Sequence, residues 1–158
     1  MRVSVLTISD SVSAGRTEDR SGPAVSARCK ELSWQVVSTA VCADDRAVIE
    51  SFLKQRADSD EIDLILTTGG TGLGPRDVTP EATLAVVDRV IPGFPEHMRA
   101  VGAKSTARAL LSRAAAGIRR NTIIVNLPGS PRGAVESLDA IFDLLPHAVA
   151  VLHGARHG

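Results

Sequence analysis

Two kinds of hydrophobic pattern alternate along this chain. Short strand-like runs occur at residues 3–8, 34–41, 63–68 and 122–127, and the last two are the near-continuous apolar runs typical of strands buried on both faces. Between them, apolar residues recur at helical spacing. This alternation predicts an α/β domain with three layers, αβα, around a mostly parallel sheet.

Turn and capping residues mark where several of the helices begin. Pro23 suits a first helical turn, and either Asp44 or Asp45 can cap the next helix. Thr79 before Pro80 predicts a third helix start, with Thr79 as N-cap, and this helix ends at Pro92-Gly93. Further helical patterns are expected at 96–111, 133–145 and 147–153.

Length and composition narrow the class of protein. The 158 residues predict one domain over 1–158, with a core at about 3–154. Eighteen basic residues balance eighteen acidic ones, which argues against a nucleic-acid binder. With three Phe, one Trp and no Tyr, an aromatic cage for a ligand is not expected.

No membrane or secretory segment is predicted. No apolar run reaches the roughly 18–20 residues of a membrane span, and the chain opens on a strand pattern rather than a signal peptide. Cys29 and Cys42 lack metal-binding or CxxC spacing. Two reduced thiols in a cytoplasmic protein are the expectation.

Polar residues and glycines follow each strand, where ligands bind in open α/β sheets. Ser9-Asp10 follow the first strand and Asp44-Asp45 the second, while the loops 69–77 and 128–133 follow the other two. All of these segments are expected to meet at one edge of the sheet.

The loop 69–77 carries four glycines, which let backbone N–H groups approach an oxyanion. It matches neither GxxxxGK[ST] nor GxGxxG, because no Lys follows and Pro75 takes the sixth position from Gly70. Anion binding is the favoured interpretation, and a simple chain reversal is the alternative.

Asp44 and Asp77 are the candidate acidic pair. Mg²⁺ binds one or two carboxylates together with substrate phosphates, so such a pair suits nucleotidyl transfer. A helix cap for Asp44 and a turn role for Asp77 remain open from the residues alone. The four histidines show no ligand spacing, and residues 129–133 do not form a G-x-S-x-G elbow.

Read together, these segments resemble a known family. The run Thr67 to Gly72 followed by Arg76 to Ala82 resembles the signature of the molybdopterin adenylyltransferases, whose domain also occurs in gephyrin. Further matches are Ile8 to Asp10, Ile91 to Phe94, Leu111 to Gly117 and Asn126 to Pro131.

The resemblance implies a homotrimer that uses ATP and Mg²⁺ to adenylylate the terminal phosphate of molybdopterin, releasing pyrophosphate. It implies essential, metal-side roles for Asp77 and Asp44, although the acid at Asp44 follows Ala43 where the family usually has Pro. Ser112 matches a position near the pterin phosphate. The strand-end loops and the resemblance together give these candidate substrate-binding residues: Ser9, Asp10, Gly69, Gly70, Thr71, Gly72, Thr79, Ser112, Pro128, Gly129, Ser130 and Pro131.

Two other readings of the resemblance stay open. One is a paralogue that binds molybdopterin without transferring AMP. The other is a molybdate-insertion domain, which usually accompanies further domains. An adenylyltransferase would hand its product to a molybdate-insertion protein as a possible partner.

Overall fold

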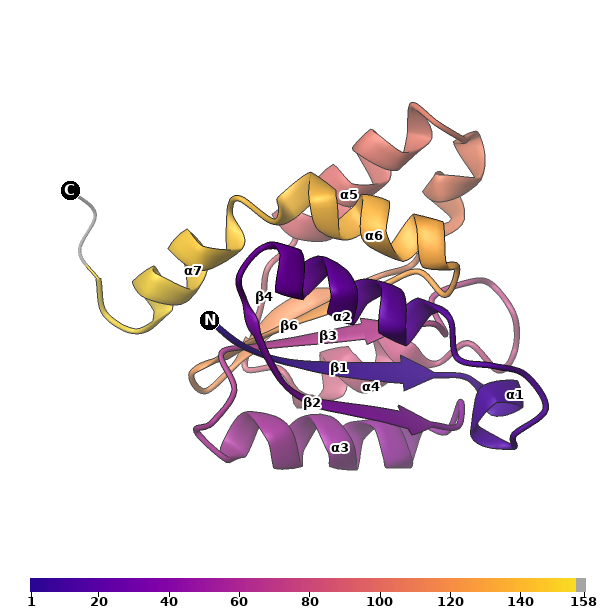
Figure 1. Ribbon diagram of the computed structural model, residues 1–158, viewed down its shortest axis with the longest axis horizontal. Coiled ribbons are helices and arrows are strands. Elements are labelled where there is room, and N and C mark those ends of the chain that lie inside the picture. The colour runs from indigo at the N-terminus through magenta and orange to yellow at the C-terminus, as the bar shows by residue number, and fades with distance from the viewer. Residues whose placement is uncertain (156–158) are drawn as a thin grey trace.

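The computed structural model describes residues 1–155 and shows one six-stranded sheet between two helical layers (Figure 1). The strands are β1 (Arg2–Ile8), β2 (Gln35–Cys42), β3 (Leu64–Thr68), β4 (Arg89–Val90), β5 (Ala116–Arg119) and β6 (Thr122–Leu127). Their order is β2-β1-β3-β6-β5-β4. Neighbouring strands from β2 to β6 are parallel, and the pairs β6–β5 and β5–β4 are antiparallel. The expected α/β fold is confirmed; residues 156–158 of the predicted domain, with His157, lie outside the described part.

Each face of the sheet has its own hydrophobic core. Helices α2 (Ser21–Glu31), α5 (Gly93–Ala103), α6 (Pro131–Ile141) and α7 (Leu145–Leu152) cover one face, and α3 (Arg46–Asp58) and α4 (Thr79–Val86) cover the other (Figure 1). Aliphatic side chains fill both cores, such as Val25 and Leu138 in the first and Ile49 and Leu53 in the second. Burying one such side chain contributes about 1.5–3 kcal/mol, so the two layers hold the sheet firmly.

Two elements differ from the predicted pattern in the middle of the chain. The helix at Thr79 ends at Val86 rather than at Pro92, and Val90 belongs to the two-residue strand β4. The helix predicted over 96–111 divides into α5 and a 3-10 helix, η1 (Ala107–Leu111). The added Cβ of an alanine at Gly102 would lie 2.8 Å from Ala109 Cβ, so Gly102 lets the two segments pack closely.

The start of the chain also contains an element that the hydrophobic pattern did not predict. A short helix, α1 (Asp10–Ser13), follows β1 directly, and the Ser9 hydroxyl caps it by accepting from the Val12 N–H. No helix among residues 1–155 has the length and apolar character needed to cross a bilayer.

The strand order creates the place for a site. The chain runs from β2 on one side of β1 to β3 on the other, so connections leave the carboxyl ends of β1 and β3 in opposite directions. A crevice forms at such a switch point in open α/β sheets. The segments after β1 and β3 therefore frame a ready-made cleft.

Candidate active site at the switch point

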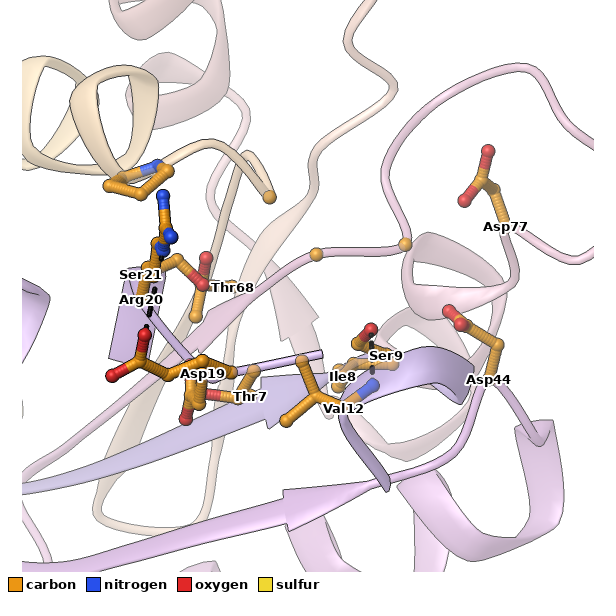
Figure 2. Close-up of a pocket in the computed structure, with 15 residues that line it drawn as sticks. Thr7, Ile8, Ser9, Val12, Asp19, Arg20, Ser21, Asp44, Thr68 and Asp77 are labelled. Atoms are coloured by element: carbon orange, nitrogen blue, oxygen red, sulfur yellow. Dashed lines mark hydrogen bonds and ion pairs between the residues drawn. The ribbon is translucent and has the colours of Figure 1, made fainter. Parts of the chain in front are cut away.

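A cavity of about 320 Å³ lies at this switch point (Figure 2). The ends of β1 and β3 supply its floor through Ile8, Thr68 and Gly69. Figure 2 shows Asp44 and Asp77 toward one end of the cavity and Arg20 and Ser21 toward the other. Ser21 opens α2 and Pro131 opens α6, so two helix N-termini border the cavity.

Asp44 is held by a reciprocal contact with Asp10. The Asp10 N–H donates to Asp44 Oδ2 at 2.9 Å, and the Asp44 N–H donates to Asp10 Oδ1 at 3.0 Å. The other oxygen, Asp44 Oδ1, is buried without a hydrogen-bond partner. Burial raises the pKa of Asp44, and the neighbouring charges of Asp10 and Asp77 raise it further. A buried acceptor left unpaired costs free energy unless something binds it.

The neighbouring acid has a different task. Asp45 Oδ1 accepts from the Val48 N–H at 3.1 Å and thereby caps α3. Asp45 is exposed and does not line the cavity, whereas Asp44 does. The structure thus separates the two acids that the sequence left equivalent: the cap falls to Asp45, and Asp44 faces the cleft.

Asp77 closes the glycine loop on itself. Its Oδ2 accepts from the Gly74 N–H at 2.9 Å, and its own N–H donates to the Gly74 oxygen at 3.0 Å. An alanine Cβ at Gly72 or Gly74 would stand 2.9 Å from this carboxylate oxygen. The turn role and the cavity position of Asp77 therefore coexist.

Two glycines allow β1 and β3 to approach at the cavity floor. Gly69 has φ +103°, and an added Cβ would lie 2.2 Å from the Ile8 carbonyl oxygen. Gly70 has φ +70°, and its added Cβ would lie 2.2 Å from Thr79 Oγ1 and 3.0 Å from Asp44 Oδ1. Both positions require glycine, by conformation and by space.

A second cavity of about 220 Å³ adjoins the first across the β6 end. Its walls come from α5, η1 and α6, and it includes Ser112, Pro128 and Ser130. The Thr68 hydroxyl in the first cavity donates to the Pro128 oxygen at 2.6 Å, which joins the two walls. None of the four aromatic residues lines either cavity.

Comparison with known proteins identifies the family. Residues 4–147 match the family described as a probable molybdopterin binding domain. The chain belongs to this family.

The relatives share nearly the whole length of the domain. The molybdopterin adenylyltransferase of Helicobacter pylori strain J99 is 41% identical over 156 residues, covering 98% of this chain and 89% of that protein. The Escherichia coli K12 enzyme of the same name is 39% identical, with 98% and 79% covered. The solved structure of the molybdopterin biosynthesis enzyme MoaB from Thermus thermophilus is 45% identical, with a TM-score of 0.92 and 98% and 97% covered.

Within this molybdopterin-binding domain, the structure distributes the candidate residues over three places. The first cavity contains Ser9, Asp44, Gly69, Gly70, Asp77, Gly129 and Pro131, and the second contains Ser112, Pro128 and Ser130. The remaining four, Asp10, Thr71, Gly72 and Thr79, line neither cavity. Thr79 is fully buried and makes no cap; its hydroxyl donates to the Gly69 oxygen at 2.9 Å.

Several N–H groups of the glycine loop are already used within the protein, contrary to what its composition predicts. The N–H groups of Gly69, Gly74 and Asp77 already donate within the protein. The Thr79 N–H donates to the Gly70 oxygen, and the first turn of α4 is buried. The helix starts that do border the first cavity belong to α2 and α6 instead.

Arg113 is a supporting residue that sequence reasoning missed. Its Nε donates to the Gly72 oxygen and its Nη2 to the Asp77 oxygen, both at 2.8 Å, and its backbone N–H donates to the Thr71 oxygen. Its Nη1 pairs with Glu81; burial raises the pKa of that carboxyl, but this bond, a backbone hydrogen bond and the nearby arginine charges together lower it. The one available signal was its position in the 111–117 segment that carries the family resemblance.

Proposed function

We propose that this protein transfers the AMP group of ATP to the terminal phosphate of molybdopterin and releases pyrophosphate. A phosphate oxygen of molybdopterin attacks the α-phosphorus of ATP, and the bond from that phosphorus to the bridging oxygen of pyrophosphate breaks. The observation that carries the proposal is the pair Asp44 and Asp77 in one cavity at the switch point, joined through Thr68 and Pro128 to a second cavity. Two adjoining cavities suit a reaction of two bound substrates.

The residues of the first cavity fit a divalent cation. Asp44 Oδ1 is a buried oxygen without a partner, and Asp77 supplies a second carboxylate in the same cavity. No group of three or more His, Cys, Asp or Glu side chains within 1–155 is arranged to hold a metal by itself. Two carboxylates completed by substrate phosphates are the donor set that Mg²⁺ favours. Bound Mg²⁺ would neutralise charge on the phosphates during transfer.

The second cavity fits a phosphate at the end of a polar ligand. The Ser112 hydroxyl accepts from the Ala114 N–H, and the Ser130 hydroxyl accepts from the Gly133 N–H. Each hydroxyl therefore keeps its own hydrogen to donate to an anion. Arg99 and Arg108 add positive charge to the same walls. We assign molybdopterin to this cavity and the ATP phosphates to the first.

The chain must overcome the repulsion between the phosphates of the two substrates. Two phosphates must approach each other, and the protein must orient them while excluding competing water. The N-termini of α2 and α6 border the first cavity; Asp19 already accepts from the Gly22 N–H of α2, so the α6 N-terminus is the one that favours added negative charge. Because the chain has no net charge, this oriented local dipole replaces a broad positive surface.

The test compares two acids, Asp77 and Asp45. Asp77→Asn should lower turnover by about 100-fold or more, because it removes a carboxylate at the reacting phosphates, while molybdopterin binding survives. Asp45→Asn is the matched control and should keep full turnover, since asparagine caps a helix as well as aspartate does. Adenylylated molybdopterin is measured by chromatography with ATP and Mg²⁺, and molybdopterin binding by calorimetry. Wild-type protein that binds molybdopterin but forms no product would instead be a binding-only member of the family.

The assembly, location and partner extend the same proposal. We infer a homotrimer in the cytoplasm that passes its product to a molybdate-insertion protein, on the strength of the family resemblance. Light scattering should give three times the mass of one chain. A stable monomer would contradict the trimer without affecting the transfer assay.

A further inference from the structure

An ion pair between Arg76 and Asp10 connects the loop that carries Asp77 to the segment after β1, where Asp10 contacts Asp44. Arg76 Nε donates to Asp10 Oδ2 at 3.0 Å and Nη2 donates to Oδ1 at 3.1 Å. The two residues are 66 positions apart, one in the loop after β3 and one in the turn after β1. The Arg76 side chain is 67% exposed. A pair this exposed adds little to stability, but its two hydrogen bonds fix the orientation of the two side chains relative to each other.

Both carboxylate oxygens of Asp10 accept hydrogen bonds within the protein. Its Oδ1 accepts from both Arg76 and the Asp44 N–H, and its Oδ2 accepts from Arg76. It also lines neither cavity. The bonds of its carboxylate thus hold neighbouring segments of the protein together.

The contact continues from Asp10 to Asp44. The Asp10 N–H holds Asp44 Oδ2, so the other oxygen, Oδ1, stays on the side of Gly70, where it is buried and unpaired. Arg76 directly precedes Asp77 in the chain. A continuous series of contacts thus runs from Asp44 through Asp10 and Arg76 to Asp77.

We propose that Arg76 and Asp10 are positioning residues that fix the placement of Asp44 relative to Asp77. The proposal rests on the proposed function, because the placement matters only if the two carboxylates act on the same phosphates. Partners that orient metal-side carboxylates typically change metal affinity by about 10–100-fold when they are removed. The bridge would act in this way while contributing little to folding.

The chain contains a matched pair with the same geometry elsewhere. Arg119 Nε and Nη2 donate to the two carboxylate oxygens of Asp58, both at 2.9 Å. This pair joins the end of α3 to β5 at the opposite edge of the sheet from the cavity, and its arginine side chain is only 21% exposed. Loss of Arg119 should therefore lower stability more than loss of Arg76 does. Loss of Arg76 should instead change the properties of the site.

The experiment compares Arg76→Gln with Arg119→Gln in the full chain. Mn²⁺ serves as the probe, and its binding in the presence of ATP is followed by electron paramagnetic resonance without any turnover. Arg76→Gln should weaken Mn²⁺ binding about tenfold and lower kcat about tenfold, with KM for molybdopterin unchanged. Arg119→Gln should lower the melting temperature more than Arg76→Gln and leave Mn²⁺ binding and kcat unchanged.

Two further variants separate positioning from general damage. Asp10→Asn should match Arg76→Gln, and the double variant should be no worse than either single one, because both remove the same bridge. Arg76→Lys should recover only part of the loss, since an ammonium cannot make the two-pronged contact. The proposal is overturned if Arg76→Gln keeps wild-type Mn²⁺ binding and kcat, or if the two losses simply add.

The outcomes also distinguish this proposal from the proposed function. Wild-type protein that binds Mn²⁺ with ATP but transfers no AMP would contradict the transfer reaction, and the Mn²⁺ titration of Arg76→Gln would still decide the positioning role. Wild-type protein that binds no Mn²⁺ in the presence of ATP would overturn both.

Discussion

An acid at each end of the sheet has its pKa shifted in the opposite direction: Asp63 at the amino end and Asp44 at the carboxyl end. At the amino end, Asp63 accepts from the Arg2 N–H at 2.7 Å and from Arg2 Nη2 at 3.0 Å; these bonds outweigh its burial and lower its pKa. At the carboxyl end, Asp44 has one oxygen bonded and one unpaired, and burial raises its pKa. Both carboxylate oxygens of Asp63 accept hydrogen bonds within the protein, whereas one oxygen of Asp44 remains available to a ligand.

The same contrast extends to the surrounding backbone. At the amino end, the Thr122 hydroxyl donates to the Ile62 oxygen at 2.7 Å, which ties β6 to the approach of β3. At the carboxyl end, Gly69 and Gly70 adopt left-handed conformations that few other residues tolerate. Left-handed glycines and the unpaired Asp44 oxygen therefore distinguish the carboxyl end, whereas the left-handed residues next to the amino ends of the strands are the non-glycines Ser33, Asp60 and Arg120.

The largest effect is expected where the carboxyl end has no room to adjust. Gly69→Ala places a Cβ 2.2 Å from the Ile8 oxygen at φ +103°, so the ends of β1 and β3 must separate, at a cost of about 3 kcal/mol. Gly15→Ala is the control, with a similar φ of +74° and no neighbour within 4 Å, and should cost about 1 kcal/mol or less. Urea unfolding measures both, and equal losses would show that the close approach is unimportant.

A smaller effect tests the amino end. Asp63→Asn should reduce the free energy of unfolding by about 2 kcal/mol near neutral pH, because the charged bonds from Arg2 are lost. Since the folded pKa of Asp63 lies below its ordinary value of 3.8, its stabilisation is present above that value and is lost as the pH falls through the folded pKa. The difference between variant and wild type should therefore vanish in strong acid. Unfolding curves at several pH values check this, and a difference that persists unchanged in acid would contradict it.

The smallest effect has the opposite sign. Asp44→Asn should raise the free energy of unfolding by about 1 kcal/mol near neutral pH, because it relieves a buried charge, and should abolish turnover. The folded pKa of Asp44 is raised, so its penalty is complete above the folded pKa and disappears as the pH falls toward 3.8. Melting temperatures should rise by about 2–4 °C at neutral pH. A lower melting temperature would place Asp44 with Asp63 as a stabilising acid and remove the contrast.

Much of the fold was predictable because it depends on local pattern. The strands β1, β2, β3 and β6 carry apolar runs that are long enough to recognise, and all four are found. Strands β4 and β5 were missed, since they have only two and four residues and pair in the antiparallel part of the sheet. Short strands of this kind gain their definition from neighbours rather than from their own periodicity.

The sequence predicted which residues belong to the candidate site better than it predicted the hydrogen bonds that they make. Glycines and acids after the strands identified Asp44, Asp77 and Gly69, and all three line the first cavity. Thr79 matched a capping pattern, yet its hydroxyl serves the Gly69 oxygen. Capping signals specify a helix start locally, but a buried hydroxyl takes whichever acceptor the fold brings close.

The sequence by itself determined the α/β class, the family and the glycine loop, because each depends on residue order alone. Tertiary structure decided between Asp44 and Asp45, by using the second as a helix cap. It also brought Asp10 to Asp44 across 34 positions and to Arg76 across 66. These contacts depend on β2 and β3 flanking β1, an arrangement that forms only when the strands pair and that no local pattern in the chain specifies.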